Sequence, residues 1–254
     1  MIKLFRGDLK RMVRDKTTYI CFAITMVLGF ASIFLSMLLL SYGDGDITDE
    51  GISSLLSSDL FGAVQPYGQG LLVVATVSSI KIVSEFKTGA IRDKMVIGYK
   101  RKQILGSYAL SFSVFAVVSL LFSLIGHLLS NSIVSLYTGL PINIDVGHLI
   151  GFFLLSVLSF LMNILLCNSL VILTKGKTLS ILLAVLVATA LAAVAVYVPV
   201  DSMVIDFIPL LWPMFVATSF YDPEYLWFTI FGIIAFISII FNITFLIFRR
   251  YDIQ

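Results

Sequence analysis

The sequence predicts an all-α membrane protein with six transmembrane helices and with both termini in the cytoplasm. Composition is the first observation behind this prediction: of the 254 residues, 59% are hydrophobic and 13% are charged, whereas soluble domains carry about 25% charged residues. The second observation is the distribution of charge. All 17 Lys and Arg residues fall into four short clusters, and the long stretches between the clusters contain no basic residue.

The basic clusters predict the topology. They lie within residues 3–16, 81–102, 175–177 and 249–250. Because basic loops are retained in the cytoplasm during insertion, the chain must leave the cytoplasm and return to it between successive clusters, so each of the three gaps holds two spans. A bilayer core of about 30 Å needs about 20 apolar residues per helix. We expect the spans at residues 18–42, 64–84, 104–130, 148–173, 179–198 and 225–248.

The residues before the first span predict an amphipathic helix that lies in the membrane interface. Lys and Arg residues fill one helical face, and apolar residues recur on the other, namely Ile2, Phe5, Leu9, Met12 and Val13. The chain is thus divided into an interfacial helix at residues 1–17 and a single transmembrane domain at residues 18–254. Since every basic cluster flanks a span, we expect these charges to contact membrane lipids and do not expect nucleic acid as a partner.

Two of the predicted spans differ in character from the others. The second span is too polar for a good lipid-facing helix and is a candidate wall of a translocation pathway, formed by Gln65, Gln69, Thr76 and Ser79. The fifth span is rich in alanine, and small residues on one face allow membrane helices to approach closely; this candidate packing or dimer face is formed by Ala184, Ala188, Ala192 and Ala195. Its partner is either another helix of this chain or a second copy.

The external loop at residues 199–224 is too apolar to stay in water. It contains two prolines, Pro209 and Pro213, in its central part, and these block a continuous span. We therefore expect a re-entrant helical hairpin that dips into the outer leaflet between the fifth and sixth spans. The hairpin either caps a pathway as an extracellular gate or anchors aromatic side chains at the interface; the candidate gate residues are Phe207, Trp212 and Phe215.

The sequence contains no motif of a catalytic or metal site. It has no G-x-S-x-G, H-E-x-x-H or C-x-x-C pattern, so the chain by itself is not expected to be an enzyme or to hold a catalytic group, cofactor or metal. The middle of each predicted span is also free of ionisable residues, whereas ion-coupled transporters usually carry them there. If the protein moves a substrate, the energy is expected from a cytoplasmic partner.

One cytoplasmic loop, at residues 85–103, is large enough to contact such a partner. Within it, Ala90, Ile91, Met95 and Val96 can share the apolar side of a short helix, while Arg92, Asp93 and Lys94 are expected to be more exposed. Gly98 is expected to end this helix. The alternative interpretation is a basic loop that serves only to orient the spans.

Residues 85–104 have the pattern Glu-x-x-x-Gly-x-Ile-Arg-x-Lys-hydrophobic-x-x-Gly, followed by a basic pair and Gln-Ile. This pattern resembles the first cytoplasmic loop of the ABC-type-2 permease family, the membrane subunits of bacterial ABC exporters. The amphipathic N-terminal helix, the six spans and the external hairpin extend the resemblance over essentially the whole chain. The chain departs from the pattern at Ala90, where the family commonly has threonine, and at Tyr99, where a small residue is common.

The resemblance implies a coupling helix at residues 88–97 that docks in a cleft of a separately encoded ATPase subunit. The docking candidates are Glu85, Phe86, Gly89, Ile91, Arg92, Lys94 and Met95. Glu85 is also expected to pair with a nearby basic residue and to stiffen the joint. Two permease subunits, either two copies of this chain or this chain and a homologue, would assemble over two ATPase subunits in the bacterial cytoplasmic membrane. ATP and Mg²⁺ would then bind the ATPase subunits.

The function implied is export of an amphipathic or hydrophobic substrate, such as an antimicrobial or cytolytic peptide or a drug. An energy-independent immunity or scaffold protein that sequesters a toxic peptide is the alternative, and an intramembrane enzyme is disfavoured by the missing catalytic groups. Recruitment of an ATPase distinguishes the first two classes.

Overall fold

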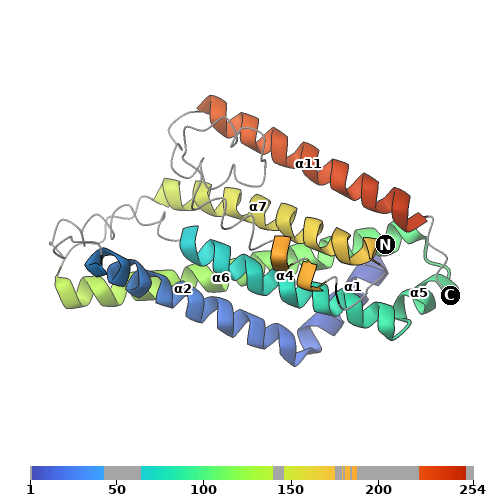
Figure 1. The fold of residues 1–254 in the computed structure, drawn as a ribbon, viewed down its shortest axis with the longest axis horizontal. Coiled ribbons are helices and arrows are strands. Elements are labelled where there is room, and N and C mark those ends of the chain that lie inside the picture. Colours follow the sequence, from blue (N-terminus) through green and yellow to red (C-terminus); the bar gives the residue numbers. More distant parts are fainter. Residues whose placement is uncertain are drawn as a thin grey trace.

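The computed structural model describes residues 2–42, 64–139, 146–174, 179, 181–183, 185–187 and 223–249. Within these ranges the chain is helical and contains no strand. The helices are α1 (Ile2–Arg14), α2 (Lys16–Tyr42), α4 (Val64–Lys87), α5 (Ala90–Val96), α6 (Arg101–Thr138), α7 (Val146–Leu173) and α11 (Pro223–Arg249). The five long helices run alongside one another, and the short helix α5 lies at one end of the bundle (Figure 1).

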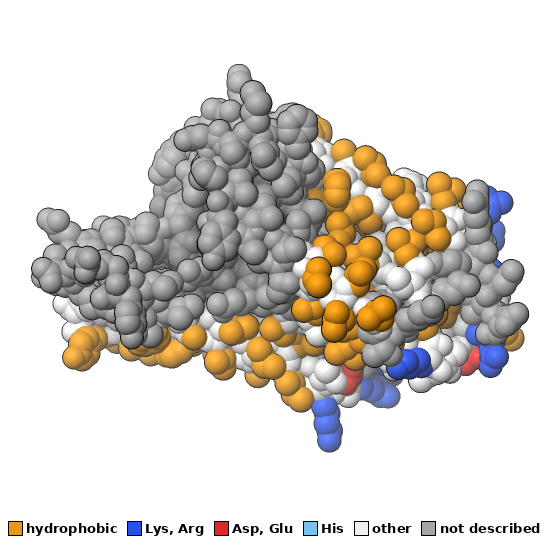
Figure 2. All heavy atoms as spheres, in the orientation of Figure 1, with side chains coloured by type: hydrophobic (Ala, Val, Ile, Leu, Met, Phe, Trp, Pro, Cys, Tyr) orange, Lys and Arg blue, Asp and Glu red, His pale blue; other side chains and the backbone are white. Residues whose placement is uncertain are grey.

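Two stretches of the described helices are long and apolar enough to cross a membrane, Arg101–Thr138 and Ile230–Arg249. Large apolar side chains on both are exposed, as expected for helices that face lipid. Figure 2 shows hydrophobic side chains over much of the described surface on one side of the molecule, with Lys and Arg side chains gathered toward one end. The all-helical class is therefore confirmed for the described residues, and two helices support membrane placement. The count of six spans and their orientation stay predictions.

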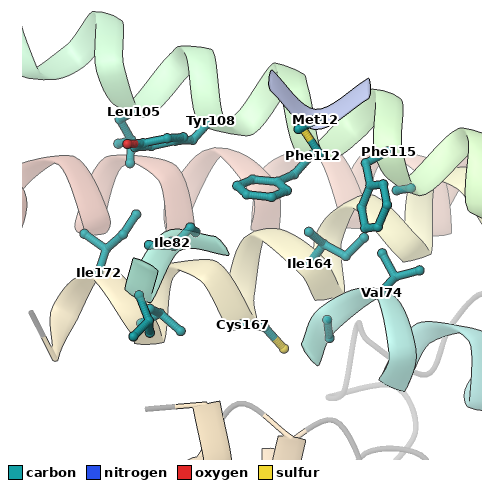
Figure 3. Packing of buried hydrophobic residues seen from close by; sticks show 14 of the residues in the cluster. Met12, Val74, Ile82, Leu105, Tyr108, Phe112, Phe115, Ile164, Cys167 and Ile172 are labelled. Carbon is teal, nitrogen blue, oxygen red and sulfur yellow. The ribbon is translucent and has the colours of Figure 1, made fainter. Parts of the chain in front are cut away.

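The core lies between α4, α6 and α7. It is formed by aliphatic and aromatic side chains spaced at helical intervals, including Val74, Phe112, Phe115 and Ile164. The rings of Phe112 and Phe115 extend from α6 toward α7, where Ile164 lies, and toward Val74 of α4 (Figure 3). These side chains fix the separation of the three helices.

Helices α2 and α6 touch backbone to backbone at two glycines. A Cβ atom on Gly29 of α2 would overlap the carbonyl group of Ser123, and a Cβ atom on Gly126 of α6 would overlap the carbonyl group of Met26. The ring of Phe22 lies beside this crossing, stacked on Phe122 with ring centroids 5.2 Å apart. Such approach through small residues is the usual way membrane helices gain close van der Waals contact.

Helix α1 forms where the amphipathic helix was predicted, but it packs differently from the prediction. The residues it buries are Leu4, Asp8 and Met12, which lie one helical turn apart on a single face. Ile2 and Val13, assigned to the apolar face by the sequence pattern, are exposed. The helix therefore presents an acidic residue to the protein, and this residue needs a partner inside the fold.

Candidate functional site

Helix α5 is a single short helix held between two glycines in the left-handed region. Gly89 precedes it with φ of 73°, and Gly98 follows it with φ of 101°. At the C-terminal end, the N–H of Gly98 donates to the carbonyl oxygen of Met95 at 2.9 Å and the N–H of Tyr99 donates to that of Lys94 at 3.1 Å. This pair of bonds is a Schellman motif, which requires a residue with positive φ at the position of Gly98. The prediction that Gly98 ends the helix is confirmed.

The side chain of Lys94 connects α5 to three other helices. Its Nζ lies 2.9 Å from a carboxylate oxygen of Asp8 on α1 and 2.8 Å from one of Glu85 at the end of α4. It also donates a hydrogen bond to the hydroxyl of Tyr108 on α6 at 3.2 Å and lies over the Tyr108 ring, 4.4 Å from its centroid. We call Lys94, Asp8, Glu85 and Tyr108 the Lys94 network.

Three members of the Lys94 network are buried and Glu85 is partly buried, so its charges depend on one another. Lys94 and Asp8 are each 6% exposed. Each charged group of the network has hydrogen-bond partners. The second oxygen of Asp8 accepts a bond of 2.6 Å from the hydroxyl of Ser107, and the Tyr108 hydroxyl donates to Glu85. A buried ion pair with its hydrogen bonds complete is tolerated, whereas removal of one member typically costs about 3 to 5 kcal/mol because an unpaired charge remains.

Two further ion pairs lie next to the network. The guanidinium of Arg11 on α1 is 3.3 Å from the second oxygen of Glu85. On the other side, Nζ of Lys81 on α4 is 3.3 Å from a carboxylate oxygen of Asp15, in the turn between α1 and α2. Partial burial by itself would raise the pKa of Asp15, but the hydrogen bond from the Thr17 backbone N–H and the charge of Lys81 together hold that pKa below its ordinary value of 3.8.

Only one side of α5 faces outward. Ile91 is 1% exposed and belongs to the core, whereas Val96 is 80% exposed and Ile97, which follows the last helical residue, is 73% exposed. The expectation that Val96 shares the apolar side with Ile91 was wrong, because Val96 is the last residue of the helix and faces outward. Arg92 and Asp93 are exposed as well. We call Arg92, Asp93, Val96 and Ile97 the outer face of α5. Two exposed large apolar side chains beside one basic and one acidic side chain form a candidate contact surface.

The structure divides the predicted docking residues into two groups. Arg92 is exposed, but Ile91 and Lys94 are buried within this chain, and Glu85, Phe86, Gly89 and Met95 are partly buried. The expectation that Lys94 is exposed was wrong, because the buried Asp8 and the partly buried Glu85 provide it with two carboxylate partners. The expectation that Glu85 pairs with a nearby basic residue is confirmed by its contacts with Lys94 and Arg11.

The other predicted site residues are described only in part. In α4, Ser79 is fully buried and Thr76 is partly buried, while the side chains of Gln65 and Gln69 lie outside the described set. The hydroxyl of Ser79 has no hydrogen-bond partner among the described residues. The remaining candidates also lie outside the described residues: Ala184, Ala188, Ala192, Ala195, Phe207, Trp212 and Phe215.

Asp8, Lys81 and Tyr108 were not among the residues singled out from the sequence. Asp8 carried a signal, since it is the acidic residue that shares a helical face with Leu4 and Met12. Nothing local marks Tyr108, which lies in the first turns of a long apolar helix. Within the described ranges, no group of three His, Cys, Asp or Glu side chains is placed to hold a metal ion, and Lys94 accounts for the meeting of Asp8 and Glu85.

These observations define a helical protein, two of whose described helices can cross a membrane and whose short helix α5 is fixed to its neighbours by a buried lysine. Comparison of the sequence with known protein families and with curated proteins finds no match.

Proposed function

We propose that this chain is the membrane subunit of an ATP-driven exporter in the bacterial cytoplasmic membrane, with six spans and both termini in the cytoplasm. In this proposal the outer face of α5 contacts a separate ATPase subunit, and the cargo is amphipathic or hydrophobic, such as a peptide or a drug. The resemblance of residues 85–104 to the coupling loop of ABC-type-2 permeases supports the class of protein. The two long apolar helices support the membrane placement.

The observation that carries the proposal is the two-sided placement of α5. Its outer face is free to contact a partner, and its inner side is fixed through Lys94 to α1, α4 and α6. A force applied to α5 is therefore passed to three helices at once, because the ion pairs and the core contacts of Ile91 leave it little independent movement. A loop that only oriented the spans would need neither the buried lysine nor an apolar outer face.

Within this proposal, the exposure of the side chains divides the residues of α5 into two roles. Arg92, Asp93, Val96 and Ile97 are available to the ATPase subunit, and their mixture of apolar and charged groups suits a protein interface. Ile91 and Lys94 instead hold the helix to its own subunit. Variants of the first group should lose docking, and variants of the second group should lose transmission of the movement.

Co-purification with an ATPase subunit encoded beside this gene tests the proposal. The double variant Arg92→Glu, Ile97→Ser should reduce the ATPase recovered by about tenfold or more, as expected for an interface hot spot worth about 2 kcal/mol. The control is Leu136→Ser, an equally exposed apolar residue near the far end of α6. Insertion of the variants is checked by their yield in washed membranes.

Two results would contradict the proposal. One is that the chain never recruits an ATPase although it is stably inserted. The other is that its activity in cells persists when every candidate ATPase partner has been deleted, which would select the energy-independent immunity protein. If the double variant loses insertion, the outer face serves folding and not docking.

A further inference from the structure

A cavity of about 380 Å³ opens beside the Lys94 network, between α1, the start of α2, the C-terminal half of α4 and the first turns of α6. Arg11 and Lys81 provide its basic groups, Asp8, Asp15 and Glu85 provide its acidic groups, and Ser111 and Phe112 lie among its most buried lining residues. Its volume falls within the range of about 300 to 1,000 Å³ that is usual for small-ligand sites.

The buried wall of the cavity includes a hydroxyl group without a partner. Ser111 is 1% exposed, and its Oγ has no hydrogen-bond partner among the described residues. Two other serines of α6 are satisfied by their own helix: Ser113 donates to the carbonyl oxygen of Ala109 at 2.7 Å and Ser119 to that of Phe115 at 2.9 Å. Ser130 of α6 also lacks a partner among the described residues, but it does not line this cavity. Because an unpaired buried hydroxyl is unfavourable, its position beside a cavity indicates an occupant with a polar group.

The charges around the cavity favour a zwitterion. Two ion pairs line it, Arg11 with Glu85 and Lys81 with Asp15. Asp8 also lines it, but its two oxygens are already bound by Lys94 and by Ser107. Lys94 does not line the cavity but neutralises Asp8, which leaves two cations and two carboxylates on the wall and no net charge to attract an anion. It can offer cations to a phosphate and carboxylates to an ammonium group at the same time.

The edge of the cavity favours a lipid as the source of this zwitterion. Ile80, which lines the cavity on α4, is a large apolar side chain that is substantially exposed. Ile20 and Ile24 of α2 are exposed too. A ligand whose head group enters the cavity and whose acyl chains lie against such a surface buries both parts. A soluble ligand would leave the apolar edge uncovered.

We propose that this cavity binds the head group of a zwitterionic phospholipid that carries a primary amine. The phosphate lies toward Arg11 and Lys81 and accepts a hydrogen bond from Ser111, and the ammonium group donates to Asp15 and Glu85. A trimethylated amine cannot donate these hydrogen bonds, so the site discriminates against choline lipids. The inference requires a membrane protein but not an ATPase partner, so the lipid experiment and the docking experiment can fail independently.

Native mass spectrometry of the full-length protein in detergent micelles tests the site. Phosphatidylethanolamine, phosphatidylcholine and phosphatidylglycerol with identical acyl chains are added separately. We expect the ethanolamine lipid to be retained most strongly, and Lys81→Gln to reduce its retention by about tenfold, the effect expected for loss of one charge-assisted hydrogen bond. Lys10→Gln is the matched control, because Lys10 is exposed on α1 and does not line the cavity.

Ser111→Leu should remove the hydroxyl donor, place an apolar side chain in the cavity and abolish retention of the lipid. If that variant fails to fold, Asp15→Asn, which changes a partly exposed lining residue, takes its place and should weaken the ethanolamine lipid more than the choline lipid. Equal retention of the three lipids, or an unchanged lipid affinity in Lys81→Gln, would overturn the proposal. Displacement of the lipid by free phosphoethanolamine at the same concentration would overturn the assignment to a lipid, since the acyl chains would then contribute nothing.

Discussion

The buried ammonium group of Lys94 faces two carboxylates from different helices, those of Asp8 and Glu85. The ion pairs alone do not set the contribution of Lys94 to stability, since the cost of removing charged groups from water offsets much of their mutual attraction. The network instead fixes the relative positions of the helices that carry its side chains. The Nζ atom can meet Asp8, Glu85 and Tyr108 together only when α1, α4, α5 and α6 are correctly placed.

Replacing Lys94 with methionine should destabilise the protein by about 3 kcal/mol, because Asp8 would remain buried without a cation and Glu85 would keep only its contact with the exposed Arg11. The measurement is the thermal unfolding temperature in detergent, where about 1 kcal/mol corresponds to about 2 to 4 °C for a chain of this size. The control is Lys10→Met on the exposed side of α1.

The triple variant Lys94→Met, Asp8→Asn, Glu85→Gln should recover part of this loss, since no unpaired buried charge is left. If the single variant unfolds at the temperature of the wild type, the ion pairs in the structure do not contribute as described.

The stability of the protein should depend on pH through the carboxylate of Asp15. Its pKa in the folded protein lies below the ordinary value of 3.8, so its carboxylate contributes stability above that value and loses the contribution as the pH falls through the lower folded pKa. Asp15→Asn should therefore unfold at a lower temperature than the wild type at about pH 7, and the difference should vanish at about pH 2. A difference that is the same at both pH values would exclude the carboxylate as its cause.

At the residue scale, the sequence predicted an ion pair only where the two side chains lie close together in the chain. Glu85 and Lys94 lie within one loop, and a pairing of Glu85 with a basic residue was expected. Asp8 lies 86 positions before Lys94, and no local pattern in α5 indicates that α1 will bring a carboxylate to it. Lys94 was therefore assigned to the exposed side, because a lysine without a known partner is almost always exposed.

At the scale of elements, the crossing of α2 and α6 depends on two glycines that leave no room for a side chain. Gly126→Ala should destabilise the protein by about 1 to 3 kcal/mol, the usual cost of overpacking, because the added methyl group meets backbone atoms that cannot rotate away. The unfolding temperature of the purified protein measures the effect.

Gly7→Ala is a matched control for this substitution. Gly7 is also helical, but an added Cβ atom there meets nothing within 4 Å. Alanine is the better helix former by about 1 kcal/mol, so this variant should be neutral or slightly stabilised. Equal behaviour of the two variants would show that helix propensity, and not the close crossing, determines the result at Gly126.

The sequence predicted the elements better than their contacts. The start of α4, the end of α5 at Gly98 and the presence of a helix before the first span followed from apolar runs and turn residues. The close crossing did not, because Gly29 and Gly126 are single glycines within apolar helices and no repeated small-residue pattern marks them. The alanine face of the predicted fifth span was the visible pattern of this kind, and it lies outside the described residues.

At the scale of the whole molecule, the proposed topology places the two ends of α6 on opposite sides of the membrane. Single cysteines introduced at Val96, just before α6, and at Tyr137, near its far end, should react with a membrane-impermeant maleimide from opposite sides of sealed vesicles. Both positions are exposed. The native cysteines, Cys21 and Cys167, are buried, so background labelling should be low. Labelling of both introduced cysteines from the same side would contradict the proposed orientation.

The length of α6 connects the Lys94 network with the glycine crossing. The helix has 38 residues and is about 57 Å long at 1.5 Å per residue, well beyond a bilayer core of about 30 Å. Tyr108 lies about 27 Å before Gly126, and Thr138 lies about 18 Å after it. A rigid α6 that pivots at Gly126 therefore acts as a lever with unequal arms. A shift of about 3 Å at the Tyr108 end would appear as about 2 Å in the opposite direction at the far end, which is enough to open or close a contact between side chains.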